Sequence, residues 1–273
     1  MKNALKRKLL LGFLSAFIAA AAFAYIRSPR VGSVWAATPA SPAAFTRIID
    51  IGHALGPDNP AWPGDDKPFE AIQNATFEKD GYFTRKFTSL EHFGTHLDAP
   101  AHFIKGAWTV DHIPVERLFG PAVVLDVRDE TRASADYLLA PEKVTQWEAR
   151  HGRIPRGAIV VMRTGWAERW PDVARYRNMD AAKVMHFPGY SVEAVRVLID
   201  RGVVGLTIDT LSVDYGPSKD FAVHHLSHGA GLFHVENLAD LSALSESGAY
   251  LVVAPIKLEG GSGGPARVFA LMP

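Results

Sequence analysis

The sequence contains no cysteine. This absence excludes disulfide bonds, thiolate zinc sites and catalytic thiols, so any metal ion must be bound by nitrogen and oxygen ligands. An excess of one charge is missing as well, because 29 lysine and arginine residues balance 29 aspartate and glutamate residues. A chain without a net electrostatic field has little to attract nucleic acid or an anionic membrane surface. We therefore expect a small, neutral molecule as the partner rather than a polymer.

Low-complexity tracts, internal repeats and linkers are also lacking from Arg47 onward. The chain of 273 residues is long enough for one large domain and at most two. With 48% hydrophobic and 21% charged residues, its composition is typical of a folded globular protein. We predict one domain over residues 45–273.

Residues 1–44 differ in composition from the rest. Several basic residues precede an apolar run over residues 9–26, and small residues follow at Ala36 and Ala37. This order indicates a signal peptide. Because the run is near the lower limit of about 18 residues for a membrane span, an uncleaved anchor is the alternative. We predict export to the periplasm or the medium, or attachment to the membrane through this segment, with residues 27–44 as a tether or a discarded tail. A buried N-terminal helix is a further alternative, but it would not explain why basic residues precede the apolar run.

Short apolar runs rich in β-branched residues predict strands, whereas helix signals are fewer. One helix is expected from Pro141 to near Gly152, and Ser191 can cap a second over Val192–Asp200 that ends at Gly202. This mixture predicts an α/β domain. The predicted strands are Ile48–Ile51, Phe83–Leu90, Val123–Val127, Ile159–Met162, Val203–Ile208 and Leu251–Ala254.

Three histidines and an aspartate lie within eleven positions, at His92, His96, Asp98 and His102. On a straight strand His92 and Asp98 would lie about 20 Å apart, and on a helix Asp98 would rotate roughly 120° beyond the stacked His92 and His96. Neither regular element brings these side chains to one ion. Glycine and proline within the segment favour a tight turn that leaves the strand Phe83–Leu90.

Imidazole and carboxylate groups in this number suit zinc or manganese, and a carboxylate can bridge two ions. Surface histidines or satisfied buried polar groups are the alternative, and they explain a lone histidine better than such a cluster. We therefore predict the first half of a metal site here.

The segment Ala222–Leu238 carries a second group of histidines. It predicts a helix stopped by glycines and then a short apolar strand. Glu236 lies among apolar neighbours, where an unpaired carboxylate is costly and a cation would satisfy it. The glycine turn could bring His224 back against Glu236. At most one or two of these histidines need be ligands, and the roles of His225, His228 and His234 stay open.

At these residues the chain resembles the putative cyclase family, which includes bacterial kynurenine formamidase and isatin hydrolase. The run from His92 to His102 matches its signature His-x-Gly-Thr-His-x-Asp-x-Pro-x-His at every fixed position. The likeness covers about Arg47 to Leu271. It also includes Trp62-Pro63-Gly64-Asp65, Asp209–Asp214, the spacing from His224 to Glu236, and Gly260–Arg267.

The resemblance implies a single swivelling β/β/α domain, usually in homodimers or larger oligomers. It implies His92 and His96 on a first metal ion and His224 on a second, with Asp98 and Glu236 touching both. Zn²⁺ or Mn²⁺ is expected, with one or two ions per subunit, because family members differ in both respects. It further implies that His102 is the general acid/base rather than a ligand. Export would be a departure from the mostly cytoplasmic formamidases and weakens a role in tryptophan breakdown.

The expected activity is metal-assisted hydrolysis of the carbon–nitrogen bond of a small aryl-formamide or cyclic amide. Trp62 and Phe93 are candidates for gripping a flat substrate, and Phe187, Tyr190 and Tyr215 are candidates for the pocket wall.

Two other classes of protein are suggested by parts of the sequence. A serine hydrolase is suggested by Gly-x-Ser-x-Gly around Ser262, but no aspartate or histidine follows Ser262 in the chain, as that fold requires. An exported, non-catalytic metal- or solute-binding protein stays the alternative. His102 discriminates against it, because a pure metal store would not need a proton carrier.

Overall fold

Residues 45–64 and 67–273 are described by the structure, which is a computed structural model. The predictions for residues 1–44 and the resemblance at Asp65 lie outside the described residues. None of the helices in the described ranges combines the length and the apolarity needed to cross a membrane.

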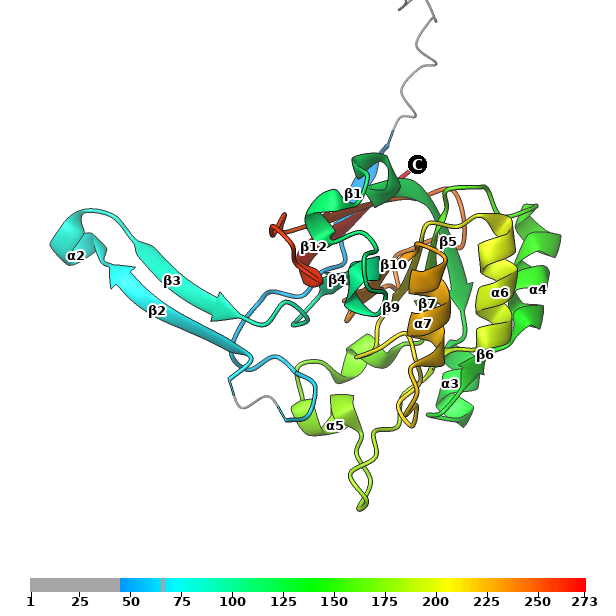
Figure 1. The fold of residues 1–273 in the computed structure, drawn as a ribbon, viewed down its shortest axis with the longest axis horizontal. Helices are drawn as coiled ribbons and strands as arrows, with labels where there is room; N and C mark the ends of the chain where they lie inside the picture. The colour runs from blue at the N-terminus through cyan, green and yellow to red at the C-terminus, as the bar shows by residue number, and fades with distance from the viewer. Residues whose placement is uncertain (1–44, 65–66) are drawn as a thin grey trace, which may run out of the picture. The chain divides into compact units, whose positions relative to one another are not determined.

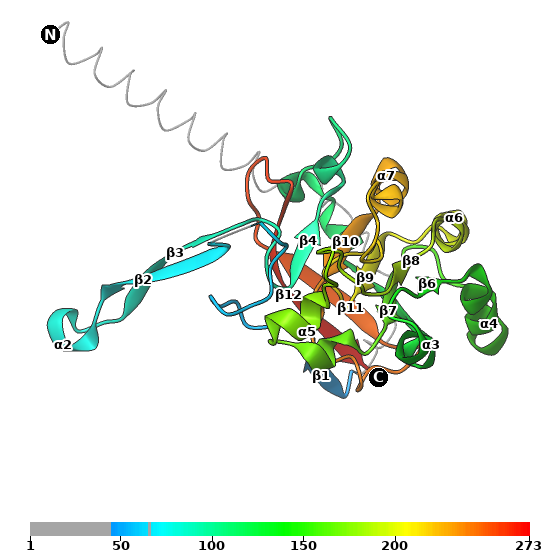
Figure 2. The same cartoon turned by 90° about the horizontal axis from the view of Figure 1, so that it is seen from below.

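A closed sheet forms the centre of the fold (Figures 1 and 2). The strand order is β1-β12-β11-β5-β7-β9-β10-β4, and because β4 also pairs with β12 the strands after β1 close into a barrel. Strands β5, β7, β9 and β10 run parallel, and the remaining pairs are antiparallel. The strands are β1 (Arg47–Asp50), β4 (His96–Asp98), β5 (Phe119–Asp126), β7 (Ile159–Arg163), β9 (Gly205–Ile208), β10 (Phe233–Glu236), β11 (Tyr250–Pro255) and β12 (Gly263–Met272).

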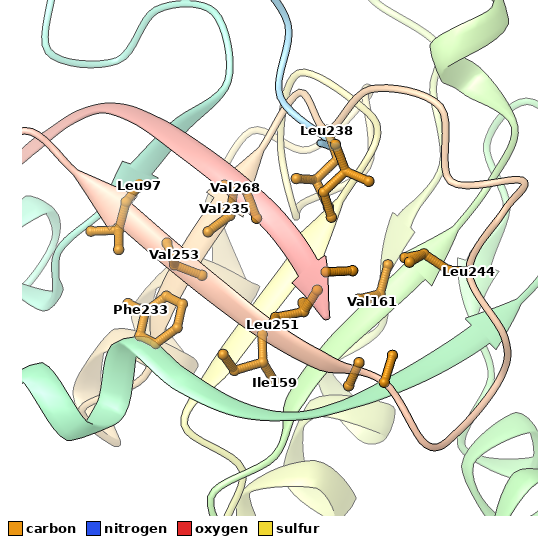
Figure 3. Close-up of a cluster of buried hydrophobic side chains, with 14 of the residues drawn as sticks. Leu97, Ile159, Val161, Phe233, Val235, Leu238, Leu244, Leu251, Val253 and Val268 are labelled. Atoms are coloured by element: carbon orange, nitrogen blue, oxygen red, sulfur yellow. The ribbon is translucent and has the colours of Figure 1, made fainter. Parts of the chain in front are cut away.

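Side chains alternate between two hydrophobic cores because successive strand residues face opposite sides of a sheet. On β5, Val124 belongs to a cluster drawn from most strands of the barrel, which Figure 3 shows with Val161, Val235 and Leu251. Its neighbour Val123 belongs to the other cluster, between the sheet and the helices. Burial on both faces explains why these strands have nearly continuous apolar sequences.

The predicted helices are present, and Figure 1 shows them along one side of the barrel. The Ser191 side chain accepts a hydrogen bond from the Ala194 N–H, and Gly202 ends that helix in the left-handed region at φ 74°. The helices are α2 (Phe77–Asp80), α3 (Arg128–Ala133), α4 (Pro141–His151), α5 (Val173–Arg177), α6 (Val192–Arg201) and α7 (Ala222–Gly229). Short elements complete the chain: 3₁₀ helices η1 (Pro100–His102), η2 (Val110–His112), η3 (Val115–Leu118) and η4 (Trp166–Arg169), and paired strands β6 (Leu138–Leu139) and β8 (Gly189–Tyr190).

A two-stranded hairpin extends from the barrel (Figures 1 and 2). Its strands β2 (Phe69–Ala75) and β3 (Thr84–Ser89) pair only with each other among the described residues, and α2 lies at its tip. The sequence predicted β3 but not β2. We call residues 69–89 the arm.

Candidate metal centre

The ligand candidates meet where the barrel closes. Strand β4 lies between β10 and β12, and its register places Asp98 opposite His234 and His96 opposite Glu236. Residues two apart on a strand share a face, so His96 and Asp98 point to the same side. The closing strand therefore brings the two histidine-rich segments of the sequence together.

The prediction of a turn throughout the first motif is partly wrong. His96 and Asp98 lie on a regular strand, and His102 lies in the 3₁₀ helix η1. The turn is confined to the residues before β4, where Gly94 adopts a positive φ of 64°. This bend folds His92 back until its Nδ1 is 2.6 Å from Asp98 Oδ1, which a straight strand could not achieve.

His224 approaches the same carboxylates from α7. Its Nε2 lies 3.5 Å from Asp98 Oδ2 and 3.5 Å from Glu236 Oε1, and His96 Nε2 lies 3.6 Å from Glu236 Oε2. These separations exceed the usual length of a hydrogen bond. They are close to the roughly 3.4 Å between two ligands of a tetrahedral ion with bonds of about 2.1 Å. The predicted return of His224 onto Glu236 is thus present, with room for a cation between them.

Among the residues that the structure describes, two groups of side chains could hold a metal ion, and they share Asp98. One consists of His92, His96 and Asp98, and the other of Asp98, His224, His234 and Glu236, with the ligand atoms of each group within 4.8 Å of one another. All of these residues are buried except His92, which is partly exposed. Nitrogen and carboxylate donors in this number fit a divalent ion such as Zn²⁺ or Mn²⁺.

The second nitrogen of each predicted histidine ligand is held by a hydrogen bond. His224 Nδ1 lies 2.7 Å from Asp214 Oδ2, and His96 Nδ1 lies 2.9 Å from the Gly94 carbonyl oxygen. Such partners fix the tautomer and direct the other nitrogen at the ion. For His92 the partner is Ser262, 2.9 Å from its Nε2.

Ser262 does not have the hydrogen bonds of a nucleophile. Its hydroxyl donates to Glu91 Oε2 at 2.6 Å, so it accepts from His92 instead of giving a proton to it. The glycine-rich segment thus supports a ligand of the centre, which agrees with the exclusion of a serine hydrolase. Asp214, Glu91 and Ser262 were not assigned these roles from the sequence. The contact between Glu91 and Ser262 joins segments far apart in the chain, whereas that of Asp214 with His224 depends on the loop between them.

Burial and neighbouring charges shift the pKa values of the ionisable groups at the centre. Burial alone would raise the pKa of Asp98, but the charges of His96 and His92 and the nearby imidazole groups of His224 and His234 hold it well below its usual range. Burial and the charge of Asp98 raise the pKa of Glu236 well above its usual range. Although burial opposes it, Asp214, Asp98 and Glu236 raise the pKa of His224 to about 10. A proton on His224 therefore supplies the positive charge that a bound ion would replace.

His102 has a different environment from these histidines. Its ring stacks on His92 with centroids 3.9 Å apart and meets Phe103 edge-on. Burial lowers the pKa of His102 to about 4, so the ring is neutral at pH 7 and can accept a proton. Of the remaining histidines, His225 is exposed, whereas His228 and His234 are buried, and His234 belongs to the second of the two groups.

A cavity of about 450 Å³ opens above these residues. Trp62 lines it with 37% of its surface exposed. Phe93 is only 1% exposed and stacks on Phe69, with ring centroids 6.1 Å apart. Trp62 is therefore better placed than Phe93 to touch a substrate.

The wall predicted from Phe187, Tyr190 and Tyr215 is wrong. None of the three lines this cavity, and Phe187 and Tyr190 are buried in the hydrophobic cores. The sequence reasoning missed Phe103 and Phe221, although each lies close in the chain to a predicted site residue. The wall includes Leu90, Phe103, Leu211, Phe221 and Asn237.

Comparison with known proteins gives a consistent result. The model of a family described as Putative cyclase matches residues 49–215. An isatin hydrolase from Roseibium aggregatum is 34% identical over 242 residues, covering 83% of this chain and 92% of that enzyme. A kynurenine formamidase from Bacillus cereus is 28% identical over 223 residues, covering 80% of this chain and 94% of that enzyme.

A solved structure extends the likeness to the fold. The crystal structure of an isatin hydrolase bound to the product analogue thioisatinate superposes with a TM-score of 0.78 and 34% identity, covering 83% of this chain and 92% of that one. This similarity confirms the predicted fold class.

Proposed function

The chain belongs to the putative cyclase family, and from that premise we infer that it is a metal-dependent hydrolase that cleaves the carbon–nitrogen bond of a small amide. The observation that carries this function is the pair of metal-binding groups sharing Asp98 at an apolar cavity, with the neutral ring of His102 beside them. The names of the relatives support an aryl-formamide or a cyclic amide such as isatin as the substrate. Trp62 and Phe221, with ring centroids 6.0 Å apart at the cavity, offer aromatic surface to such a flat molecule.

We propose that His92, His96 and Asp98 hold a first ion and that Asp98, His224 and Glu236 hold a second, with Zn²⁺ or Mn²⁺ as the metal. When bound, a divalent ion polarises the substrate carbonyl and lowers the pKa of a bound water toward about 7. Asp214, Gly94 and Ser262 keep the histidine ligands in the orientation that this requires.

His102 is proposed to move the proton. Because its ring is neutral at pH 7, it can take a proton from the attacking water and then give it to the departing nitrogen. Its stacking on His92 holds the ring beside the metal ligands without placing it among them.

Purified protein, freed of metal and reloaded with Zn²⁺ or Mn²⁺, is expected to hydrolyse isatin, N-formylkynurenine or a simple lactam, with release of product followed by absorbance. Chelation should remove the activity, and the metal should restore it. If metal binds and no amide or ester is turned over, the alternative of a non-catalytic metal- or solute-binding protein gains, although the named relatives favour an enzyme.

The arm supports a further proposal, that the protein is a homodimer. Phe77, Phe83 and Phe87 on the arm are each at least half exposed, at 68%, 50% and 56%. An isolated two-stranded hairpin is marginally stable in water, so this apolar surface needs a partner that is always present. A second copy of the chain meets that need, and a two-fold axis would let each copy cover the arm of the other.

Phe87→Asp is expected to weaken the dimer by about 2 kcal/mol or more, which is a rise in Kd of roughly 30-fold. The reason is that an aromatic side chain covered by the partner copy would be replaced by a charged one. Sedimentation velocity measures the change. Val115, which is 77% exposed on η3 and not on the arm, offers the matched control Val115→Asp. A wild-type protein that sediments as a monomer would refute the proposal, as would equal loss of the dimer in both variants.

Export through residues 1–44 stays a prediction, with the periplasm, the medium or the membrane as the destination. Fractionation of cells that express the full chain, with N-terminal sequencing of the recovered protein, would test it.

A further inference from the structure

Two buried histidines next to the metal-binding groups have no part in the function proposed above. His228 and His234 are 1% and 0% exposed, and their nearest ring nitrogens lie 3.0 Å apart. His234 also faces the metal ligands, because its Nδ1 lies 3.8 Å from Asp98 Oδ2. A buried imidazole in contact with a metal-binding carboxylate is a candidate for the same chemistry.

The hydrogen bonds of Ser227 determine which nitrogen of His234 carries the proton. The Ser227 hydroxyl donates to the Val223 carbonyl oxygen at 2.6 Å, one turn earlier in α7. Its single proton is thereby used, so it accepts from His234 Nε2, also at 2.6 Å. The lone pair of His234 is then on Nδ1, which lies 3.8 Å from Asp98 Oδ2 and 3.0 Å from His228 Nε2.

This lone pair can accept a hydrogen bond from His228, but because it also faces a carboxylate oxygen, a cation between the two would be stabilised by both. The same arrangement recurs at His96 and His224, where one nitrogen is held by a protein partner and the other faces Asp98 or Glu236. A ring nitrogen of His234 also falls within 4.8 Å of the ligand atoms of Asp98, His224 and Glu236. His234 thus repeats, on a strand, the orientation of the histidines already assigned to metal.

We propose that His234 is a ligand of the second ion through Nδ1, together with Asp98, His224 and Glu236; this inference rests on the proposed function. Four protein ligands complete the coordination that is typical of a structural zinc site, whereas three leave a position open. The two ions would then differ in role. The second would have four buried protein ligands, whereas the first, held by His92, His96 and Asp98, would keep an open position.

His228 competes for the same nitrogen of His234. Its Nε2 lies 3.0 Å from His234 Nδ1, and its own Nδ1 is buried without a hydrogen-bond partner in the described part of the chain. Metal binding at His234 would displace this contact. His228 therefore provides a matched control, because it is equally buried and aromatic but is not assigned to the ion.

The test compares His234→Phe with His228→Phe in the full chain, stripped of metal and titrated with Zn²⁺ by calorimetry. The wild type is expected to bind two ions. His234→Phe should bind the first normally and the second about 100-fold more weakly or not at all, since loss of a ligand should exceed the roughly 10–100-fold effect of losing an orienting partner. His228→Phe should keep both. Co²⁺ absorption gives a second readout, because the d–d bands of the second ion should change only in the His234 variant.

Three results would overturn the inference: unchanged binding of both ions by His234→Phe, equal weakening in both variants, or a wild type that binds a single ion retained by His234→Phe. None of these disproves the proposed hydrolase, which fails only if the wild type binds no metal or binds it without activity. If His234→Phe does not fold, as judged by loss of the first ion as well, His234→Asn carries the test. Its side-chain oxygen can occupy the place of Nδ1 and should retain part of the affinity.

Discussion

Asp98→Asn is expected to abolish metal binding at both groups and to reduce amide hydrolysis to the metal-free background. Asp98 is the residue common to the two groups, and it is 1% exposed on the strand that closes the barrel. An asparagine keeps the shape but removes the charge that draws a cation and the second oxygen acceptor. The loss of affinity should exceed the roughly 10–100-fold that removal of an orienting partner costs. Elemental analysis of the purified variant, beside its turnover, measures the effect.

Asp209→Asn is the matched control for this prediction. Asp209 is equally buried, but its oxygens accept hydrogen bonds from Thr164 and the Ala167 N–H rather than facing the centre. That variant can lose stability yet should retain metal. Full occupancy in Asp98→Asn, or equal loss in both variants, would show that Asp98 does not hold the ions.

His102→Phe is expected to lower turnover by about 10²–10⁴-fold while metal content stays unchanged. Phenylalanine preserves the ring that stacks on His92, so the ligand keeps its support and only the proton carrier is removed. Steady-state kinetics should place the loss in kcat, with KM little changed.

His224→Ala is the opposing control, because it should lose metal as well as activity. If the His102 variant instead loses its metal while the His224 variant keeps full occupancy, the two roles have been assigned the wrong way round.

Much of the barrel could be predicted because its strands and helices have local signals. Val123 to Val127 and Ile159 to Met162 are apolar runs of strand length, and Ser191 and Gly202 mark the ends of α6. Strand β4 has no such signal, since three residues are too few for a periodic pattern. Its pairing with both β10 and β12 depends on contacts between distant segments, so the closure of the sheet could not be predicted.

In the candidate site, too, the features with a local sequence signal could be predicted and those that depend on distant segments could not. The clustering of His92, His96 and Asp98 is a property of local sequence, and so is the distance along the chain from His224 to Glu236. The cavity wall is not, because Leu90, Leu211 and Asn237 come from separate loops and share no pattern. Residue types such as Phe187 and Tyr190 suggested a wall, but aromatic side chains are as often buried in a core.

The proposed metal sites at β4 would link the supply of metal to the lifetime of the folded protein. Strand β4 pairs through three residues with β10 and through three with β12, and its Asp98 shares a face of the sheet with Glu236 of β10. Both carboxylates are buried. An ion that binds only the folded chain adds about 4 kcal/mol of stability when its free concentration is 1,000-fold above Kd. Scarcity of metal would therefore weaken the pairing of β4 with β10 and β12 first. The edges of these strands, which are paired in the folded protein, would then become accessible to proteases.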